Sequence, residues 1–92
     1  MRKLVSDKGV TALITGASSG IGAAAAASLA ARGLKVILVA RRQEKLEQLA
    51  LEISALGGQA LVMPADLSNP QGVETLVRDL FQKRISVDVL VN

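Results

Sequence analysis

Apolar residues in this chain form two alternating patterns, short continuous runs and stripes with helical spacing. The continuous runs are rich in Val, Ile and Leu and cover residues 10–15, 35–40, 60–63 and 87–91. Runs of this kind are typical of strands that are buried on both faces of a parallel sheet. We therefore expect four strands, separated by segments of a different periodicity.

Between the runs, apolar residues recur every three or four positions, which predicts three helices. We expect the first helix over Gly20–Arg32, with Gly33 just after its end. The second is expected over Arg42–Leu56 and ends at the pair Gly57-Gly58.

The third helix is expected to begin near Ser68, because Ser68 and Gln71 have the spacing of a capping box. Pro70 is compatible with this start, since proline is tolerated in a first helical turn. Five apolar residues at helical spacing predict the buried stripe of this helix: Val73, Leu76, Val77, Leu80 and Phe81.

Alternation of strand and helix at this pitch predicts an α/β fold, with parallel strands, right-handed crossovers and helices on both faces of the sheet. We expect the spatial strand order 3-2-1-4. That order leaves the apolar fourth strand at an edge with an unpaired ladder. We therefore interpret residues 1–92 as a single, partial domain that is truncated at Asn92.

Composition excludes several kinds of site. The 92 residues include no cysteine and no histidine. Disulfides and thiolate metal sites are thereby excluded, and the commonest metal ligand and neutral-pH base is missing. We expect no metal site.

Charge and hydropathy indicate which partners and which cellular location to expect. The net charge is only +3, basic residues are scattered, and Phe81 is the single aromatic residue, so we expect no nucleic-acid partner. No apolar stretch is long enough to span a membrane. Residues 1–8 lack the apolar centre of a secretory signal, so a cytoplasmic location is expected.

The turn after the first strand carries the most informative motif, Thr-Gly-Ala-Ser-Ser-Gly-Ile-Gly over residues 15–22. Glycines at a strand-to-helix turn let backbone N–H groups approach a ligand, and a helix N-terminus favours an anion such as a diphosphate. We expect Gly16 to supply a positive φ, Gly20 to admit the phosphate and Gly22 to allow close packing. Ser18 and Ser19 add hydroxyl donors. A glycine-rich loop without a ligand is the alternative.

The end of the second strand lacks the acidic residue that commonly binds the 2′-hydroxyl of NAD in dinucleotide-binding folds. Ala40 stands there instead, 18 positions after Gly22, and Arg41 and Arg42 follow. Arginine can bind a 2′-phosphate through paired, charge-assisted hydrogen bonds. The alternative is a solvated arginine pair at a helix start, although the helix dipole disfavours cations there.

Asp66 and Leu67 follow the third strand. One interpretation places Asp66 near the amino group of an adenine and Leu67 against its ring. The other makes Asp66 a loop carboxylate and Leu67 a minor core contact.

Together these motifs resemble those of the short-chain dehydrogenase/reductase family. The resemblance rests on residues 15–22, on Ala40-Arg41-Arg42, on Asp66-Leu67 and on residues 88–92, and it runs from Val10 onward. It implies a Rossmann-type dinucleotide-binding domain and an oxidoreductase that transfers hydride between a nicotinamide and a carbonyl or alcohol substrate.

The resemblance also implies specific roles. The glycine loop, including Ile21, would hold the ribose and diphosphate. Arg41, with Ser18 and Arg42, would bind a 2′-phosphate and so mark NADP(H) as the cofactor. Asp66 and Leu67 would contact adenine, and Asn92 resembles the first residue of the family's Asn-Asn-Ala-Gly motif.

The family's catalytic Asn, Ser, Tyr and Lys would lie beyond Asn92, and this chain has no tyrosine. No residue is therefore assigned a catalytic role. We expect the intact protein to be an active homo-oligomer and residues 1–92 alone to be inactive. A non-catalytic NADP(H)-binding module and a structural fragment remain the alternatives.

Overall fold

The four apolar runs form one parallel sheet in the computed structural model, which describes residues 9–92. The strands are β1 (Thr11–Thr15), β2 (Lys35–Val39), β3 (Gln59–Val62) and β4 (Val89–Val91), in the order β3-β2-β1-β4. The predicted α/β class and strand order are confirmed. Residues 1–8, on which the expected absence of a secretory signal rests, lie outside the described part.

β4 begins two residues later than its apolar pattern predicts, and Asp88 accounts for the difference. The carboxylate Oδ2 of Asp88 accepts a hydrogen bond from the backbone amide of Thr11 at 2.8 Å. The backbone amide of Asp88 donates to the carbonyl oxygen of Thr11, also at 2.8 Å. A side-chain acceptor thus occupies the place of a strand carbonyl at the start of β4.

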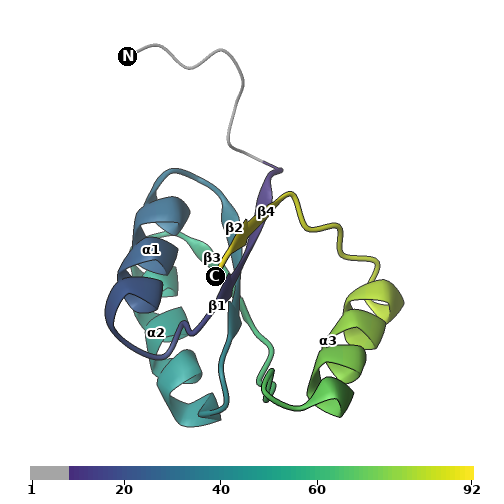
Figure 1. Ribbon diagram of the computed structural model, residues 1–92. Helices are drawn as coiled ribbons and strands as arrows, with labels where there is room; N and C mark the ends of the chain where they lie inside the picture. Colours follow the sequence, from purple (N-terminus) through teal and green to yellow (C-terminus); the bar gives the residue numbers. More distant parts are fainter. Residues whose placement is uncertain (1–8) are drawn as a thin grey trace.

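Three helices cover the sheet: α1 (Gly20–Ala31), α2 (Gln43–Ala55) and α3 (Pro70–Gln82). α1 and α2 lie side by side on one face, and α3 lies on the other (Figure 1). All three helices begin within two residues of the expected positions, and α1 and α2 end within two residues of theirs. None of those in residues 9–92 combines the length and the apolar character that a membrane crossing needs.

Strand residues alternate between two cores. Ala12 and Ile14 of β1 face α1 and α2, whereas Leu13 faces the side of α3. The first core has ten buried residues, the second five: Leu13, Ile37, Val39, Met63 and Leu76. Alternate residues of a strand point to opposite faces, so a continuous apolar run is what a sheet covered on both sides requires.

The predicted buried stripe of α3 is only partly correct. Leu76 is buried and Leu80 half-buried, but Val73, Val77 and Phe81 are exposed, Phe81 at 79% of its surface. In the described part of the chain, α3 is the one helix on its face, and Leu76 is its only buried residue. Val73, Val77 and Phe81 therefore have no neighbouring helix to cover them.

The predicted capping box of α3 is wrong. Asn69 is the N-cap, and its Oδ1 accepts from the amide of Gln71 at 2.9 Å. Ser68 lies one residue before the cap, and its hydroxyl donates to Asp66 instead, at 2.6 Å. Pro70 does occupy the first turn, as predicted.

Candidate functional site

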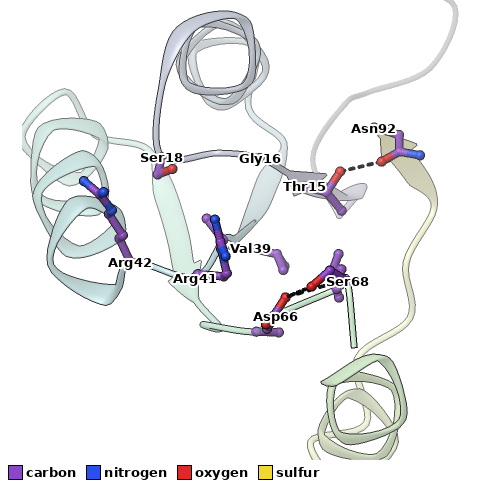
Figure 2. A pocket seen from close by; sticks show the side chains of 12 residues that line it. Thr15, Gly16, Ser18, Val39, Arg41, Arg42, Asp66, Ser68 and Asn92 are labelled. Atoms are coloured by element: carbon purple, nitrogen blue, oxygen red, sulfur yellow. Dashed lines mark hydrogen bonds between the residues drawn. The ribbon is translucent and has the colours of Figure 1, made fainter. Parts of the chain in front are cut away.

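The carboxyl ends of β1, β2 and β4 and the loop after β3 border a single open cavity of about 810 Å³ (Figure 2). In parallel α/β sheets this is the edge at which ligands bind. Twelve residues line the cavity: Thr15, Gly16, Ser18, Val39, Ala40, Arg41, Arg42, Ala65, Asp66, Leu67, Ser68 and Asn92. Seven of the eleven predicted site residues are among them.

The other four predicted residues, Ser19, Gly20, Ile21 and Gly22, do not line this cavity. They form the start of α1 beside it. Ile21 is 88% exposed there, so its side chain contributes little to the core.

The glycine loop has the backbone geometry that its sequence predicts. Gly16 and Gly20 have φ values of 63° and 58°, in the left-handed region that favours glycine. A Cβ added at either position would meet no other atom within 4 Å, so open space flanks both. A Cβ at Gly22 would overlap the carbonyl oxygen of Gly16, which explains why this position needs glycine.

The start of α1 carries no side-chain cap. Ser19 is the N-cap residue, with extended backbone, and its side chain makes no capping hydrogen bond. The first amides of a helix have no partner within the helix and carry partial positive charge. This helix start therefore offers donors to an anionic group.

α2 begins in a similar way at the end of β2. Arg42 is its N-cap residue and also makes no side-chain capping bond, and Arg41 and Arg42 are both exposed. In Figure 2 both arginines lie on one side of the cavity, across from Thr15 and Asn92, with Ser18 above them and Asp66 below. Two guanidinium groups thus stand at a second open helix start.

Backbone hydrogen bonds tie the predicted segments together. The amide of Ala17, in the glycine loop, donates to the carbonyl of Val39 at 3.2 Å. The amide of Ala65, just before Asp66, donates to the carbonyl of Ala40 at 3.0 Å. The end of β2 therefore holds the loops on both of its sides.

The surroundings of Asp66 change the pKa of its carboxyl group. Hydrogen bonds from the hydroxyl and the amide of Ser68, and to a smaller extent the positive charge of Arg41, lower the pKa of the Asp66 carboxyl. The group is therefore a carboxylate at neutral pH. The described residues contain no cluster of three or more His, Cys, Asp or Glu that could hold a metal ion.

Asn92 reaches the cavity from the end of β4 and is held by β1. The Thr15 hydroxyl lies 2.7 Å from the Asn92 side-chain oxygen, to which it donates a hydrogen bond. Thr15 itself lines the cavity, although we predicted no role for its side chain.

Five lining residues were not among the predicted binding residues: Thr15, Val39, Ala40, Ala65 and Ser68. Four of them are at, or within three residues of, the carboxyl end of a strand. That position is a usable signal, because strand ends border the ligand site in parallel sheets. Ser68 carries a different signal, its spacing of two from Asp66, which is typical of a side-chain turn.

Comparison with known proteins gives a consistent result. A family model for short chain dehydrogenases matches residues 10–92. A fatty acyl-CoA reductase of Acinetobacter baylyi is 46% identical over 85 residues, which is 92% of this chain and 29% of the relative. The chain spans between a quarter and a third of the length of the curated relatives it matches.

Solved structures agree with the sequence comparison. A citronellol catabolism dehydrogenase of Pseudomonas aeruginosa superposes with a TM-score of 0.87 at 41% identity, over 92% of this chain and 36% of that one. A metagenomic short-chain oxidoreductase in complex with NADP gives a TM-score of 0.86 at 40% identity, over 94% and 39%. On its motifs, its sheet and these matches, the chain belongs to the short-chain dehydrogenase family.

Proposed function

We propose that this chain is the NADP(H)-binding part of an oxidoreductase that acts on a carbonyl or alcohol substrate. The observation that carries the proposal is the cavity itself, which is lined by two arginines and an ionised Asp66 and lies beside the uncapped start of α1. These features match the diphosphate, the 2′-phosphate and the adenine of one dinucleotide. When bound, such a cofactor donates or accepts a hydride.

The diphosphate is assigned to the turn between β1 and α1. Gly16 and Gly20 leave open space beside the backbone, and the first amides of α1 have no side-chain cap. A side chain at either glycine would extend into that space. The start of a helix stabilises negative charge through its dipole and its free N–H groups.

The 2′-phosphate is assigned to Arg41, with Ser18 and Arg42 beside it. All three line the cavity, and the strand end carries Ala40 in place of an acidic residue. An acid at position 40 would repel a phosphate, whereas guanidinium groups bind it with charge-assisted hydrogen bonds. The NADP complex of a relative supports this choice of cofactor.

The chemistry on the substrate is assigned to the remainder of a longer protein. This chain contains no tyrosine and no histidine, and its relatives are about three to four times as long. We infer that residues 1–92 bind and orient the cofactor and that residues elsewhere move the proton, bind the substrate and form the homo-oligomer.

Substitution of Arg41 tests the cofactor assignment. Arg41→Ala should weaken NADPH binding about 10-fold or more, because a hydrogen bond to a charged group contributes roughly 1.5–3 kcal/mol. NADH binding should change little, since NADH has no 2′-phosphate. Adding Ala40→Asp should shift the preference further toward NADH. Titration calorimetry with both cofactors measures the two dissociation constants.

Arg78→Ala is the matched control, because Arg78 is exposed on α3 and does not line the cavity. It should leave both affinities unchanged. Equal losses for NADPH and NADH in Arg41→Ala would show that Arg41 does not recognise the 2′-phosphate. An unaltered protein that binds neither cofactor would refute the proposed function.

A further inference from the structure

The loop after β3 fixes one oxygen of Asp66 with its own atoms. The hydroxyl of Ser68 donates to Oδ1 of Asp66 at 2.6 Å, and the amide of Ser68 donates to the same oxygen at 3.1 Å. Figure 2 shows this pair at the floor of the cavity. Both bonds end on Oδ1, so Oδ2 is left to accept from a ligand.

The backbone of the loop is fixed as well. The amide of Ala65 is bonded to Ala40, and the carbonyl of Asp66 accepts from the amide of Asn69 at 3.3 Å. A Cβ at Gly72, in the first turn of α3, would overlap that same Asp66 carbonyl oxygen. Gly72 thus lets the helix approach the loop, and the position of Asp66 is set from both ends.

The chemistry of the free oxygen limits what it can recognise. An ionised carboxylate only accepts hydrogen bonds, so Oδ2 favours a donor such as an amino group. A carbonyl oxygen of the ligand in place of that amino group would be repelled by Oδ2. Adenine carries an exocyclic amino group, and hypoxanthine carries an oxygen at the same ring position.

We propose that Ser68 is a positioning residue, which holds Asp66 so that Oδ2 accepts from the exocyclic amino group of the cofactor's adenine. Ser68 thereby contributes to the choice of an adenine nucleotide over a 6-oxopurine nucleotide. The inference rests on the proposed function, because it needs the cofactor in this cavity. It gives a role in binding to a residue that we interpreted, from the sequence, as a helix cap.

The test compares NADPH with its deamino analogue, which carries hypoxanthine in place of adenine. Ser68→Ala should weaken NADPH binding about 3- to 10-fold, a part of the contribution of one hydrogen bond to a charged group. Binding of the deamino analogue should stay within about twofold, since it makes no such bond. Ser68→Thr keeps the hydroxyl and should restore NADPH affinity.

Three further measurements separate positioning from general damage. Ser28→Ala, at an exposed serine of α1 that does not line the cavity, should change neither affinity. With Asp66→Asn already present, Ser68→Ala should cause no further loss, because coupled residues are not additive. In a carboxyl NMR titration, Ser68→Ala should raise the pKa of Asp66 toward its ordinary value.

The outcomes are distinct. Equal weakening of both nucleotides by Ser68→Ala, or no weakening of either, would overturn the role of Ser68 and leave the proposed function intact. If the unaltered protein binds NADPH and its deamino analogue equally, the adenine contact is wrong. Binding of neither nucleotide would overturn the proposed function, and this role with it.

Discussion

Helices α1 and α2 on one face of the sheet and helix α3 on the other are held by different interactions. The first pair covers a core of ten buried residues, which includes Leu46 and Ile53 of α2. α3 contributes only Leu76 to a core of five. Buried apolar area is the main source of stability. The face covered by α1 and α2 therefore contributes more to the stability of the fold than the face covered by α3.

Side-chain capping at the N-termini of the helices shows the opposite trend: it is present in α3 and absent in α1 and α2. α1 and α2 begin at Ser19 and Arg42 without a side-chain cap. α3 begins with Asn69, whose side chain caps the amide of Gln71, and with Pro70 in its first turn. The helices with the larger core thus begin without a side-chain cap, and the helix with the smaller core has one.

The largest expected effect tests the difference in packing. Leu46→Ala removes a fully buried side chain of α2 and should lower the free energy of unfolding by about 2–5 kcal/mol. Val77→Ala, on the exposed side of α3, should lower it by less than about 0.5 kcal/mol. Urea denaturation measures both, and similar losses would contradict the comparison.

A smaller effect tests the difference in capping. Asn69→Ala should lower the free energy of unfolding by about 0.5–2 kcal/mol, because it leaves the amide of Gln71 without its acceptor. Ser19→Ala is the control, and it should cost less than about 0.5 kcal/mol because the Ser19 side chain makes no capping bond. A larger loss for Ser19→Ala would show that α1 is capped after all.

The third comparison concerns the C-terminal ends of the helices, where the smallest change is expected from Arg84. Gly33 and Arg84 follow the C-cap residues of α1 and α3 and make equivalent backbone hydrogen bonds. Gly33 has no side chain, whereas Arg84 adopts its positive φ of 56° with one. Arg84→Gly should therefore raise the free energy of unfolding by about 0.5–1 kcal/mol.

Gly33→Ala is the reciprocal change, at a φ of 100°, and should lower the free energy of unfolding by about 1–2 kcal/mol. Thermal unfolding followed by circular dichroism measures both variants. Destabilisation by Arg84→Gly would mean that the arginine side chain makes a contribution larger than the backbone strain.

The places of the strands and helices could be predicted because apolar periodicity and glycine positions determine them locally. The strand order was expected from the alternation of strand and helix and from right-handed crossovers. The stripe of α3 could not be predicted in full. Spacing shows that Val73, Val77 and Phe81 share a side of the helix, but it does not show how wide a surface that side meets.

The site could be predicted where glycine backbone geometry determines the structure. It was less predictable where two side chains compete for the same N-cap position. Gly16 and Gly22 have the geometry that the motif requires. Ser68 and Asn69 are both suitable N-cap residues, and the sequence does not decide between them. In the structure the hydroxyl of Ser68 donates a hydrogen bond to Asp66, and Asn69 is the N-cap residue of α3.

The attachment of both neighbouring loops to β2 has a consequence for protein engineering. Val39 holds the glycine turn and Ala40 holds the segment that bears Asp66, through one backbone hydrogen bond each. A redesign of cofactor choice at this strand end that shifts the main chain would displace the turn on one side and the acid on the other. Variants at residue 40 should therefore be selected together with compensating changes in both loops, and side chains that leave the backbone in place should be tried first.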